Sequence, residues 1–271
     1  MNNNFLHQID KQLTHFPCHG LQDNTNTVLM DRVDTKFILP ESSLFWVLHE
    51  LEKHCTVLDF DGRKISRYEN IYFDTHDLDF YHAHHNGKSN RFKVRCRTYK
   101  DIDTSFSEVK LKNNKKRTIK ERVRVSAPNE TLISDHQEFL YDQGILDANR
   151  LCERQKCCYS RIAFSSEASS ERVTIDFDLR FKGFSESKKA NPEGYQSLGQ
   201  FVIVELKQAY LSRNTDIYNI LRSRRIRPQS FSKYCMGMTL LLGDELKSNR
   251  FKEIGLKVDR LSALCGDQLN G

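Results

Sequence analysis

The chain has 271 residues, 38% of them hydrophobic and 29% charged, with a formal net charge of +6. This length suits one large domain or two small ones, and an all-β barrel of this size commonly forms a single domain. No apolar run approaches the ~20 residues of a membrane-spanning helix, so we expect no transmembrane segment. The excess of cations is mild overall, so the concentrated basic segments are more informative, and they indicate a polyanionic partner.

The cysteines are spread along the chain and include no Cys-x-x-Cys pair, which argues against a zinc site. We see no secretory signal, so we expect reduced thiols and a cytoplasmic protein. The eight positions are Cys18, Cys55, Cys96, Cys152, Cys157, Cys158, Cys235 and Cys265.

The chain begins with a polar extension, a strand and a helix. Residues 28–39 are predicted to form a strand that places Arg32, Asp34 and Lys36 on one face. Pro40 then opens a helix over residues 41–53, because proline fits the first turn of a helix. The Asn-rich residues 1–27 hold a short helix with apolar residues at helical spacing, namely Phe5, Ile9 and Leu13.

A second strand is predicted over residues 68–73, with Asp74 and Thr75 starting a helix after it. Further on, Asn86-Gly87 predicts a two-residue hairpin turn. The histidines between these points lack the His-x₃-His spacing and the supporting carboxylates typical of zinc, so we expect no metal there. They are His82, His84 and His85.

The stretch from Arg91 to Tyr99 carries the clearest pattern. Alternation along a strand places Phe92, Val94 and Cys96 on one face. Such a stretch by itself fits either a solvated outer face or an anion-binding face. The basic face carries four neighbouring cations, which repel one another and need compensation: Arg91, Lys93, Arg95 and Arg97.

The same alternation recurs downstream, in strands predicted over 106–112, 118–125, 156–164, 172–181 and 201–207. Helices are predicted over 131–151 and 215–224 and in the tail from Glu245, and a polar loop over 183–197. Four of the strands carry charged faces, made of Glu108, Lys110 and Lys112; Lys120, Arg122 and Arg124; Arg172, Thr174, Asp176, Asp178 and Arg180; and Ile203, Glu205 and Lys207.

A single geometry uses all of these faces. A sheet closed into a barrel with its charged faces inward encloses a basic channel, and its apolar outer faces then need helices to cover them. The helices predicted over 41–53, 131–151 and 215–224 supply that cover. We therefore predict an α+β fold, in which an antiparallel β-barrel with a charged interior is covered by α-helices.

A channel lined by Arg and Lys needs an anion, and a chain of phosphates provides the highest charge density. Phosphoryl transfer mainly requires cations that stabilise the phosphate oxygens and a metal that bridges phosphates. Carboxylates among the cations suit Mg²⁺ or Mn²⁺, or they form ion pairs with their neighbours. The candidates are Asp34, Glu108, Asp176, Asp178 and Glu205.

Nine short motifs of the chain occur in the order seen in the VTC domain. This is the polyphosphate polymerase domain of vacuolar transporter chaperone proteins, and it belongs to the triphosphate tunnel metalloenzymes. The resemblance spans roughly residues 28–240. The motifs are Arg32-x-Asp34-x-Lys36-Phe37, Tyr72-Phe73-Asp74-Thr75, Arg95-x-Arg97-x-Tyr99, Glu108-x-Lys110, Lys120-x-Arg122, Tyr159-x-Arg161, Arg172 with Asp176, Glu205-x-Lys207 and Ser232-Lys233-Tyr234.

This resemblance implies an eight-stranded tunnel domain over residues 28–242, between an extension (1–27) and a helical tail (243–271). It implies transfer of the ATP γ-phosphate onto inorganic polyphosphate with Mn²⁺ or Mg²⁺. The implied catalytic residues are Arg95, Arg97, Lys110, Lys120, Arg161, Arg172 and Lys233. The implied substrate-binding residues are Lys36, Arg32, Arg122, Tyr159, Ser232 and Lys207, and the metal ligands are Glu205 and Glu108. Asp34 stands where tunnel enzymes commonly carry Glu.

Two other functions stay open at this point. A tunnel enzyme that hydrolyses triphosphate or short polyphosphate would use nearly the same residues, with water as the attacking group. A non-catalytic module could bind polyphosphate or nucleic acid, but nucleic-acid binding usually needs aromatic residues for base stacking, and the basic faces carry almost none. We therefore expect ATP and inorganic polyphosphate as partners and no nucleic acid.

Overall fold

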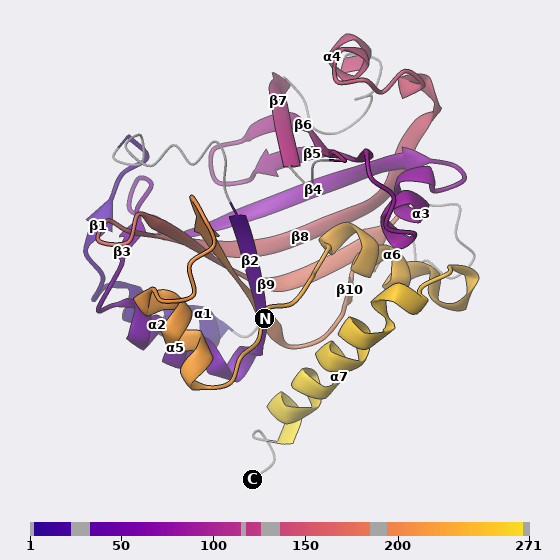
Figure 1. Cartoon of the computed structure of the whole chain (residues 1–271). Helices are drawn as coiled ribbons and strands as arrows, with labels where there is room; N and C mark the ends of the chain where they lie inside the picture. Colours follow the sequence, from indigo (N-terminus) through magenta and orange to yellow (C-terminus); the bar gives the residue numbers. More distant parts are fainter. Residues whose placement is uncertain (1–2, 23–32, 115–117, 126–135, 185–193, 268–271) are drawn as a thin grey trace.

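Eight strands form one antiparallel sheet that curves around a central space (Figure 1). The computed structural model describes residues 3–22, 33–114, 118–125, 136–184 and 194–267. Neighbouring strands follow the order β2, β11, β9, β8, β4, β5, β6, β7. In chain order their bounds are β2 (Val33–Pro40), β4 (Ile65–Thr75), β5 (Arg91–Tyr99), β6 (Thr104–Lys112), β7 (Thr118–Val125), β8 (Leu151–Ser166), β9 (Glu171–Gly183) and β11 (Phe201–Gln208).

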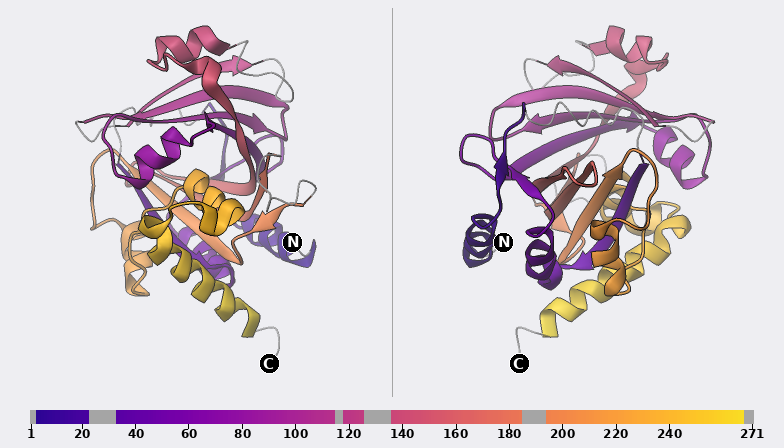
Figure 2. Two further views of the ribbon diagram at one scale, coloured as in Figure 1. Left: turned by 90° about the vertical axis from the view of Figure 1, so that its right-hand side faces the viewer. Right: turned by 60° about the vertical axis from the view of Figure 1, so that its left-hand side comes forward.

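The predicted fold class, an α+β tunnel with an antiparallel sheet covered by helices, is confirmed. Each ladder between neighbours in this order is antiparallel. Within the described residues no ladder joins β7 to β2, so the wall is an open curved sheet there instead of a fully closed barrel (Figure 2). Three short strands lie outside the main order: β1 (Cys18–His19), β3 (Thr56–Leu58) and β10 (Gln196–Ser197).

Helices cover the apolar outer face of the sheet. Over β2, β9 and β11 they are α1 (Asn3–Leu13), α2 (Leu44–Leu51) and α5 (Asp216–Ser223). Ile9 and Leu13 of α1 are fully buried, so this helix packs as part of the core. Each such side chain contributes about 1.5–3 kcal/mol through burial. The buried stripe of α2 is the one that the sequence predicts: Leu44, Val47, Leu48 and Leu51.

Two C-terminal helices instead pack against the inner face at one end of the sheet. They are α6 (Lys233–Leu242) and α7 (Lys252–Asp267), and they share a core with α3 (Asp79–His85). Asp178 has a φ of 54° and is an extra residue in the ladder between β8 and β9. This β-bulge ends the alternation predicted through Asp178 and Arg180, and the apolar Leu179 and Phe181 join the core around α6 instead.

Two predicted local structures are wrong. Within the predicted helix over 131–151, the described part from residue 136 holds only α4 (Gln137–Asp142) and a short 3-10 turn (Ala148–Arg150). Gly144, at a φ of +83°, ends α4, and β8 already begins at Leu151. Asn86-Gly87 likewise ends α3 instead of joining two strands, because Gly87 at φ +69° supplies the left-handed residue that a helix C-terminus favours.

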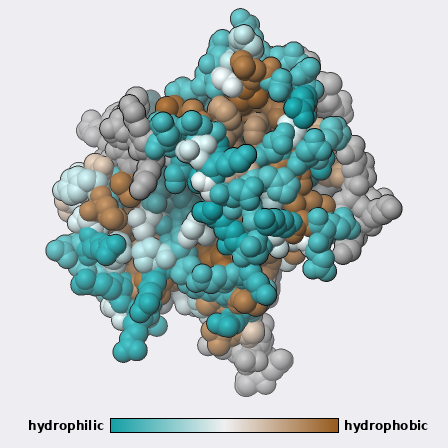
Figure 3. All heavy atoms as spheres, turned by 45° about the vertical axis from the view of Figure 1, so that its right-hand side comes forward, coloured by the Kyte–Doolittle hydropathy of each residue, from teal (hydrophilic) through white to brown (hydrophobic). Residues whose placement is uncertain are grey.

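Within the described residues, no helix is both long and apolar enough to cross a membrane. On the face shown in Figure 3, hydrophilic residues separate several small groups of hydrophobic ones. The exposed apolar side chains include Tyr141 and Leu146, in and just after α4, and Tyr210, which follows β11. The large apolar surfaces of the strands are therefore inside the molecule.

Candidate functional site

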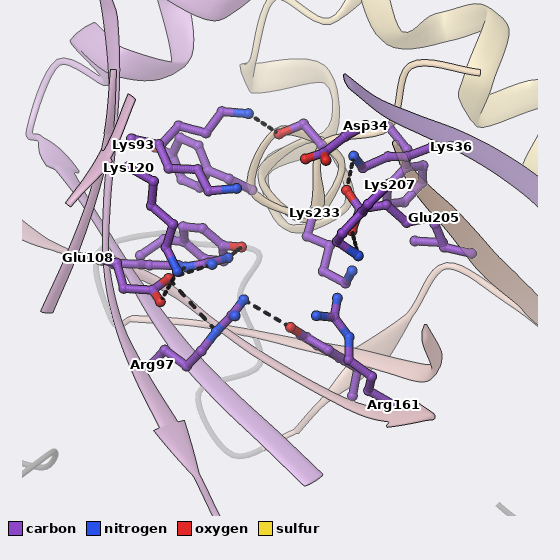
Figure 4. Close-up of a pocket in the computed structure, with 18 residues that line it drawn as sticks. Asp34, Lys36, Lys93, Arg97, Glu108, Lys120, Arg161, Glu205, Lys207 and Lys233 are labelled. Atoms are coloured by element: carbon purple, nitrogen blue, oxygen red, sulfur yellow. Dashed lines mark hydrogen bonds and ion pairs between the residues drawn. The ribbon is translucent and has the colours of Figure 1, made fainter. Parts of the chain in front are cut away.

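The curved sheet encloses a polar cavity of about 190 Å³. Strands β2, β4, β5, β6, β7, β8 and β11 contribute side chains to it, together with the segment that starts α6 (Figure 4). The wall carries nine cations and three carboxylates. The cations are Lys36, Lys93, Arg95, Arg97, Lys110, Lys120, Arg161, Lys207 and Lys233, and the carboxylates are Asp34, Glu108 and Glu205. The wall is therefore strongly positive.

Glu108 organises one wall of the cavity. Its side chain is fully buried, and it accepts hydrogen bonds from Arg95 Nε (2.7 Å), Arg95 Nη2 (2.5 Å) and Lys120 Nζ (2.5 Å). Arg97 Nε lies 3.9 Å away. Although burial disfavours a charge here, Arg95, Arg97 and Lys120 hold the pKa of Glu108 well below its usual range. Glu108 thus fixes the guanidinium of Arg95 in a two-pronged ion pair.

Asp176 plays the corresponding role on β9. It accepts from Arg161 Nε (2.5 Å) and Nη2 (2.8 Å), and from Lys233 Nζ. Burial opposes its charge, but Arg161 and Lys233 hold the pKa of Asp176 well below the ordinary value. This carboxylate ties the start of α6 to the sheet, so that Lys233 and Arg161 both reach the cavity.

Glu205 lies on the opposite wall from Glu108 (Figure 4). It accepts from Lys36 Nζ (2.5 Å), its cross-strand neighbour on β2, and Lys207 Nζ lies 3.2 Å from its other oxygen. Burial disfavours the charged form, yet Lys207 and Lys36 hold the pKa of Glu205 well below its usual range. Asp34 is the cross-strand partner of Lys207 and also lines the cavity, so two carboxylates serve this wall.

Three lysines form a row across the other side. Lys93, Lys110 and Lys120 are register partners on β5, β6 and β7. Lys93 donates to the Ser232 hydroxyl and Lys120 to Glu108, whereas no described residue forms an ion pair with Lys110. Burial lowers the pKa of Lys93 and of Lys120 to about 8, and it holds that of Lys110 well below the ordinary value, with Arg95 adding repulsion. An anion in the cavity would reduce the repulsion among these lysines and raise their pKa values.

The start of α6 is held in place from both sides. Ser232 caps the helix by accepting from Cys235 N (3.3 Å). Tyr234 donates to Asp74 Oδ2 (2.5 Å), and the same carboxylate accepts the backbone N–H groups of Thr75, Phe80 and Tyr81. Burial raises the pKa of Asp74 in spite of these bonds. Asp74 therefore links β4, α3 and α6. The helix predicted to start at Asp74 and Thr75 begins later, at Asp79, because both residues still belong to β4.

Tyrosines fill the space between the cations. Arg97 donates to the Tyr159 hydroxyl (3.1 Å), and Arg95 donates to that of Tyr72 (3.3 Å). The guanidinium carbons of Arg97 and Arg161 lie 5.3 Å from the ring centre of Tyr68. The sequence-based statement that the basic faces carry almost no aromatic residues is therefore wrong. These rings pack against arginines and other tyrosines, and such contacts also hold the cations in position.

The cavity brings together twelve of the site residues that the sequence predicts. They are Lys36, Arg95, Arg97, Glu108, Lys110, Lys120, Tyr159, Arg161, Glu205, Lys207, Ser232 and Lys233. Arg32 lies outside the described residues. Arg122 is exposed, with its guanidinium carbon 4.6 Å from the Phe106 ring centre, and Arg172 is not part of the wall. Arg172 lies on β9 directly opposite Lys207 of β11, on the same face of the sheet.

Several wall residues were absent from the predicted set. Lys93 shares the face of Arg95, so the alternation already contained it, and Tyr72 belongs to a quoted motif. Asp176 does not line the cavity but supports it, and its pairing with Lys233 across 57 residues has no local sequence pattern. The same holds for the bond between Tyr234 and Asp74.

The carboxylates present fit a divalent cation that is bound mainly through a substrate. No cluster of three or more His, Cys, Asp or Glu side chains suitable for a metal occurs in the described part of the chain. Mg²⁺ is usually held by one or two carboxylates together with phosphate oxygens, and Glu205 and Asp34 meet that requirement. Glu108 is fully buried and accepts three hydrogen bonds from Arg95 and Lys120, whereas Glu205 is 12% exposed and accepts one from Lys36, so Glu108 suits a metal less well.

The fold and the site define a protein whose curved antiparallel sheet encloses a cationic tunnel. The VTC domain family matches residues 31–242, and the chain belongs to this family. A comparison with curated proteins gives no match.

The solved structures to which the chain is similar include two candidate adenylate cyclases. One, from Bacillus halodurans, is 14% identical with a TM-score of 0.48, and the alignment covers 74% of this chain and 93% of that one. The other, from Hippeastrum, is described as having a dominant triphosphatase activity. It is 13% identical with a TM-score of 0.47, over 79% of this chain and 98% of that one.

Proposed function

We propose that this protein is a polyphosphate polymerase, which transfers the γ-phosphate of ATP onto a growing chain of inorganic polyphosphate inside the tunnel. Membership in the VTC domain family supports the proposal. The observation that carries it is the row of Lys93, Lys110 and Lys120, with depressed pKa values, inside a wall of nine cations. Without an anion, the desolvation and mutual repulsion of these lysines destabilise the protein. A chain of phosphates carries the negative charges that would compensate them.

The chain's own groups would act through position and charge. Arg95 and Arg161 are each held by two bonds to a buried carboxylate, so they present their remaining N–H groups without further ordering. Preorganised donors of this kind stabilise the charge on the transferring phosphoryl group. Lys110, without an ion-pair partner in the described chain, would take the largest share of a new anionic contact. Lys233 and Ser232 would approach from the start of α6.

A divalent cation, Mn²⁺ or Mg²⁺, would supply positive charge that neutralises part of the charge on the phosphates. Glu205, assisted by Asp34, would hold it from the β11–β2 wall. Lys36 and Lys207, which pair with Glu205 in this structure, would then be available to phosphate oxygens. Glu108 would serve to orient Arg95 and Lys120.

Incubation of the protein with ATP and Mn²⁺ or Mg²⁺ tests the proposal, with products separated by gel electrophoresis and free phosphate measured in parallel. ADP together with long polymer is the expected result. Free phosphate without polymer would instead identify a tunnel-type hydrolase. No turnover with either metal would leave only the binding function and overturn the proposed reaction.

Thermal melts distinguish a tunnel from an outward-facing basic surface. Tripolyphosphate should raise the melting temperature by a few degrees at a hundredfold excess over Kd, since a ligand that binds only the folded state adds about 2.7 kcal/mol. Heparin and duplex DNA at matched charge should raise it far less, because a duplex is too wide to enter a cavity of about 190 Å³. Equal shifts from all three would contradict binding in the cavity.

A further inference from the structure

Beyond the cavity, the charged face of the sheet continues into a second group of cations. On one face of a sheet, side chains recur at every second residue of a strand, so successive rows of register partners are roughly 7 Å apart. Next to the row of Lys93 and Lys110 lies the pair Arg91 and Lys112. Neither residue of this pair lines the cavity.

A third cation reaches this pair from a distant part of the chain. Arg250 lies in the 3-10 turn Asn249–Phe251, which follows the residues matched by the family. Its Nη1 donates to the carbonyl oxygen of His85 at 3.2 Å. The guanidinium also lies against Gly87, where an added Cβ would be only 2.5 Å from Nη1. The bond to a backbone carbonyl and the close fit to a glycine hold Arg250 beside the start of β5.

His84 shows that these cations converge. Burial lowers the pKa of His84 to about 2, and the charges that add to this shift are all positive: Lys93, Arg91, Arg250 and Lys112. Burial also lowers the pKa of Arg91, and Arg250 adds to that shift. Positive charges from β5, β6 and the C-terminal turn therefore meet around one neutral imidazole, and Lys93 belongs both to this group and to the cavity.

We propose that Arg91, Lys112 and Arg250 form a second anion-binding site that holds the part of a phosphate chain extending out of the cavity. This inference rests on the proposed function. A space of about 190 Å³ holds only a few groups the size of a phosphate, since one water occupies about 30 Å³ in the liquid. A longer chain must leave the cavity, and Lys93 leads it along the charged face toward this second site.

The site predicts a dependence on chain length. Tripolyphosphate should fill the cavity alone, whereas long-chain polyphosphate should engage both groups of cations. Arg250→Gln and Lys112→Gln should each weaken long-chain binding by roughly tenfold at low salt, which is the value of one charge-assisted contact. Neither should change tripolyphosphate affinity by more than about twofold, because both side chains lie outside the cavity wall.

Calorimetric titration of the whole chain with both probes tests this site. Arg260→Gln is the matched control, because Arg260 is exposed on α7 in the same C-terminal segment. Long-chain affinity that is unchanged in Arg250→Gln and Lys112→Gln, or lowered equally in Arg260→Gln, would overturn the second site while leaving the cavity intact. If the unaltered protein binds neither probe, the proposed function fails, and the second site fails with it.

Discussion

Lys93 and Lys110 face each other directly across β5 and β6, and Lys120 continues the row on β7. Like charges that are opposite on neighbouring strands destabilise a sheet. Glu108 compensates Lys120, and Ser232 accepts a bond from Lys93, so the cost of the empty site is concentrated at Lys110. This arrangement makes Lys110 a sensitive probe of what the tunnel binds.

Lys110→Met should stabilise the ligand-free protein and weaken triphosphate binding. Stability rises because a half-buried cation without an ion-pair partner in the described chain is replaced by an apolar chain of similar length. Affinity should fall by roughly 10–100-fold, the value of a charged hydrogen bond. Urea unfolding and calorimetric titration with tripolyphosphate measure the two effects. Lys100→Met, at an exposed position, is the control, and equal affinities in both variants would exclude Lys110 from the binding site.

Glu205→Gln should remove the metal dependence of turnover and most of the activity. The substitution keeps the shape of the side chain and deletes the charge that a cation needs. Glu69→Gln is a close control, since Glu69 is 13% exposed, compared with 12% for Glu205, and also pairs with a lysine, Lys156 at 2.9 Å. It lies outside the cavity wall. Full Mn²⁺-dependent turnover in Glu205→Gln would leave Glu205 only its ion pairs with Lys36 and Lys207.

Arg95→Met should destabilise the protein by about 3 kcal/mol, because it leaves the buried carboxylate of Glu108 with fewer partners. Adding Glu108→Gln should recover part of this loss. The comparable exposed pair is Arg67 with Asp101 at 2.9 Å, where the arginine is 66% exposed. Arg67→Met should cost at most about 1 kcal/mol. Urea unfolding of the three variants measures the free energy of unfolding. Equal decreases in Arg95→Met and Arg67→Met would mean that the buried charge of Glu108 is not stabilised by Arg95.

The alternation of residues predicted the tunnel well where strands are regular. The predicted bounds for Arg91–Tyr99 and Thr118–Val125 agree with β5 and β7. In β5 one face meets the apolar core through Val94 and Cys96, whereas β7 is mostly exposed and only Val125 joins that core. Alternation could not reveal the bulge at Asp178, which needs knowledge of the partner strand. It also could not show that Gly144 ends a helix, since an apolar pattern continues past it with Ile145 and Ala148.

The sequence predicts which residues line the candidate site, but not which of them form ion pairs with one another. Charged residues at every second position identify the lining, because a strand exposes only one face to the tunnel. Which carboxylate neutralises which cation depends on register and on α6, which is distant in sequence. Glu108, predicted as a metal ligand, is for this reason found between Arg95 and Lys120. Tyr72 and Tyr159 belong to the motifs shared with the VTC domain, whereas the position of Tyr68 between Arg97 and Arg161 depends on strand register and has no local pattern.

Gly237→Ala should displace α6 and reduce activity. A Cβ at this position would lie 2.3 Å from Gln155 Oε1 and 2.5 Å from Phe181 Cδ1, so the helix must move away from the sheet. Overpacking of this kind costs about 1–3 kcal/mol, and Lys233 and Ser232 move with the helix. Gly255→Ala is the control, since nothing lies within 4 Å of its Cβ, and it should stabilise α7 by up to about 1 kcal/mol. Melting temperatures and turnover that are unchanged in Gly237→Ala would contradict this account of how α6 is seated.

Triphosphate binding near pH 8 should be accompanied by proton uptake. Lys93 and Lys120 have pKa values of about 8, and that of Lys110 is well below the ordinary value, so a fraction of these lysines is neutral in the empty site. Phosphate oxygens favour the charged form and raise these pKa values, so protons enter with the anion. Affinity should therefore fall as the pH rises above about 8, where each bound anion has to recruit more protons.

Titration calorimetry in two buffers of different ionisation enthalpy, at one pH near 8, measures this uptake directly. Lys120→Met should lower the number of protons taken up, since one titrating group is gone, whereas Glu69→Gln, outside the cavity wall, should leave it unchanged. Identical heats in both buffers would mean that the lysine row is fully charged before the anion arrives. In that case repulsion within the row would be compensated by some means other than the loss of protons, and the depressed pKa values would not describe the empty tunnel.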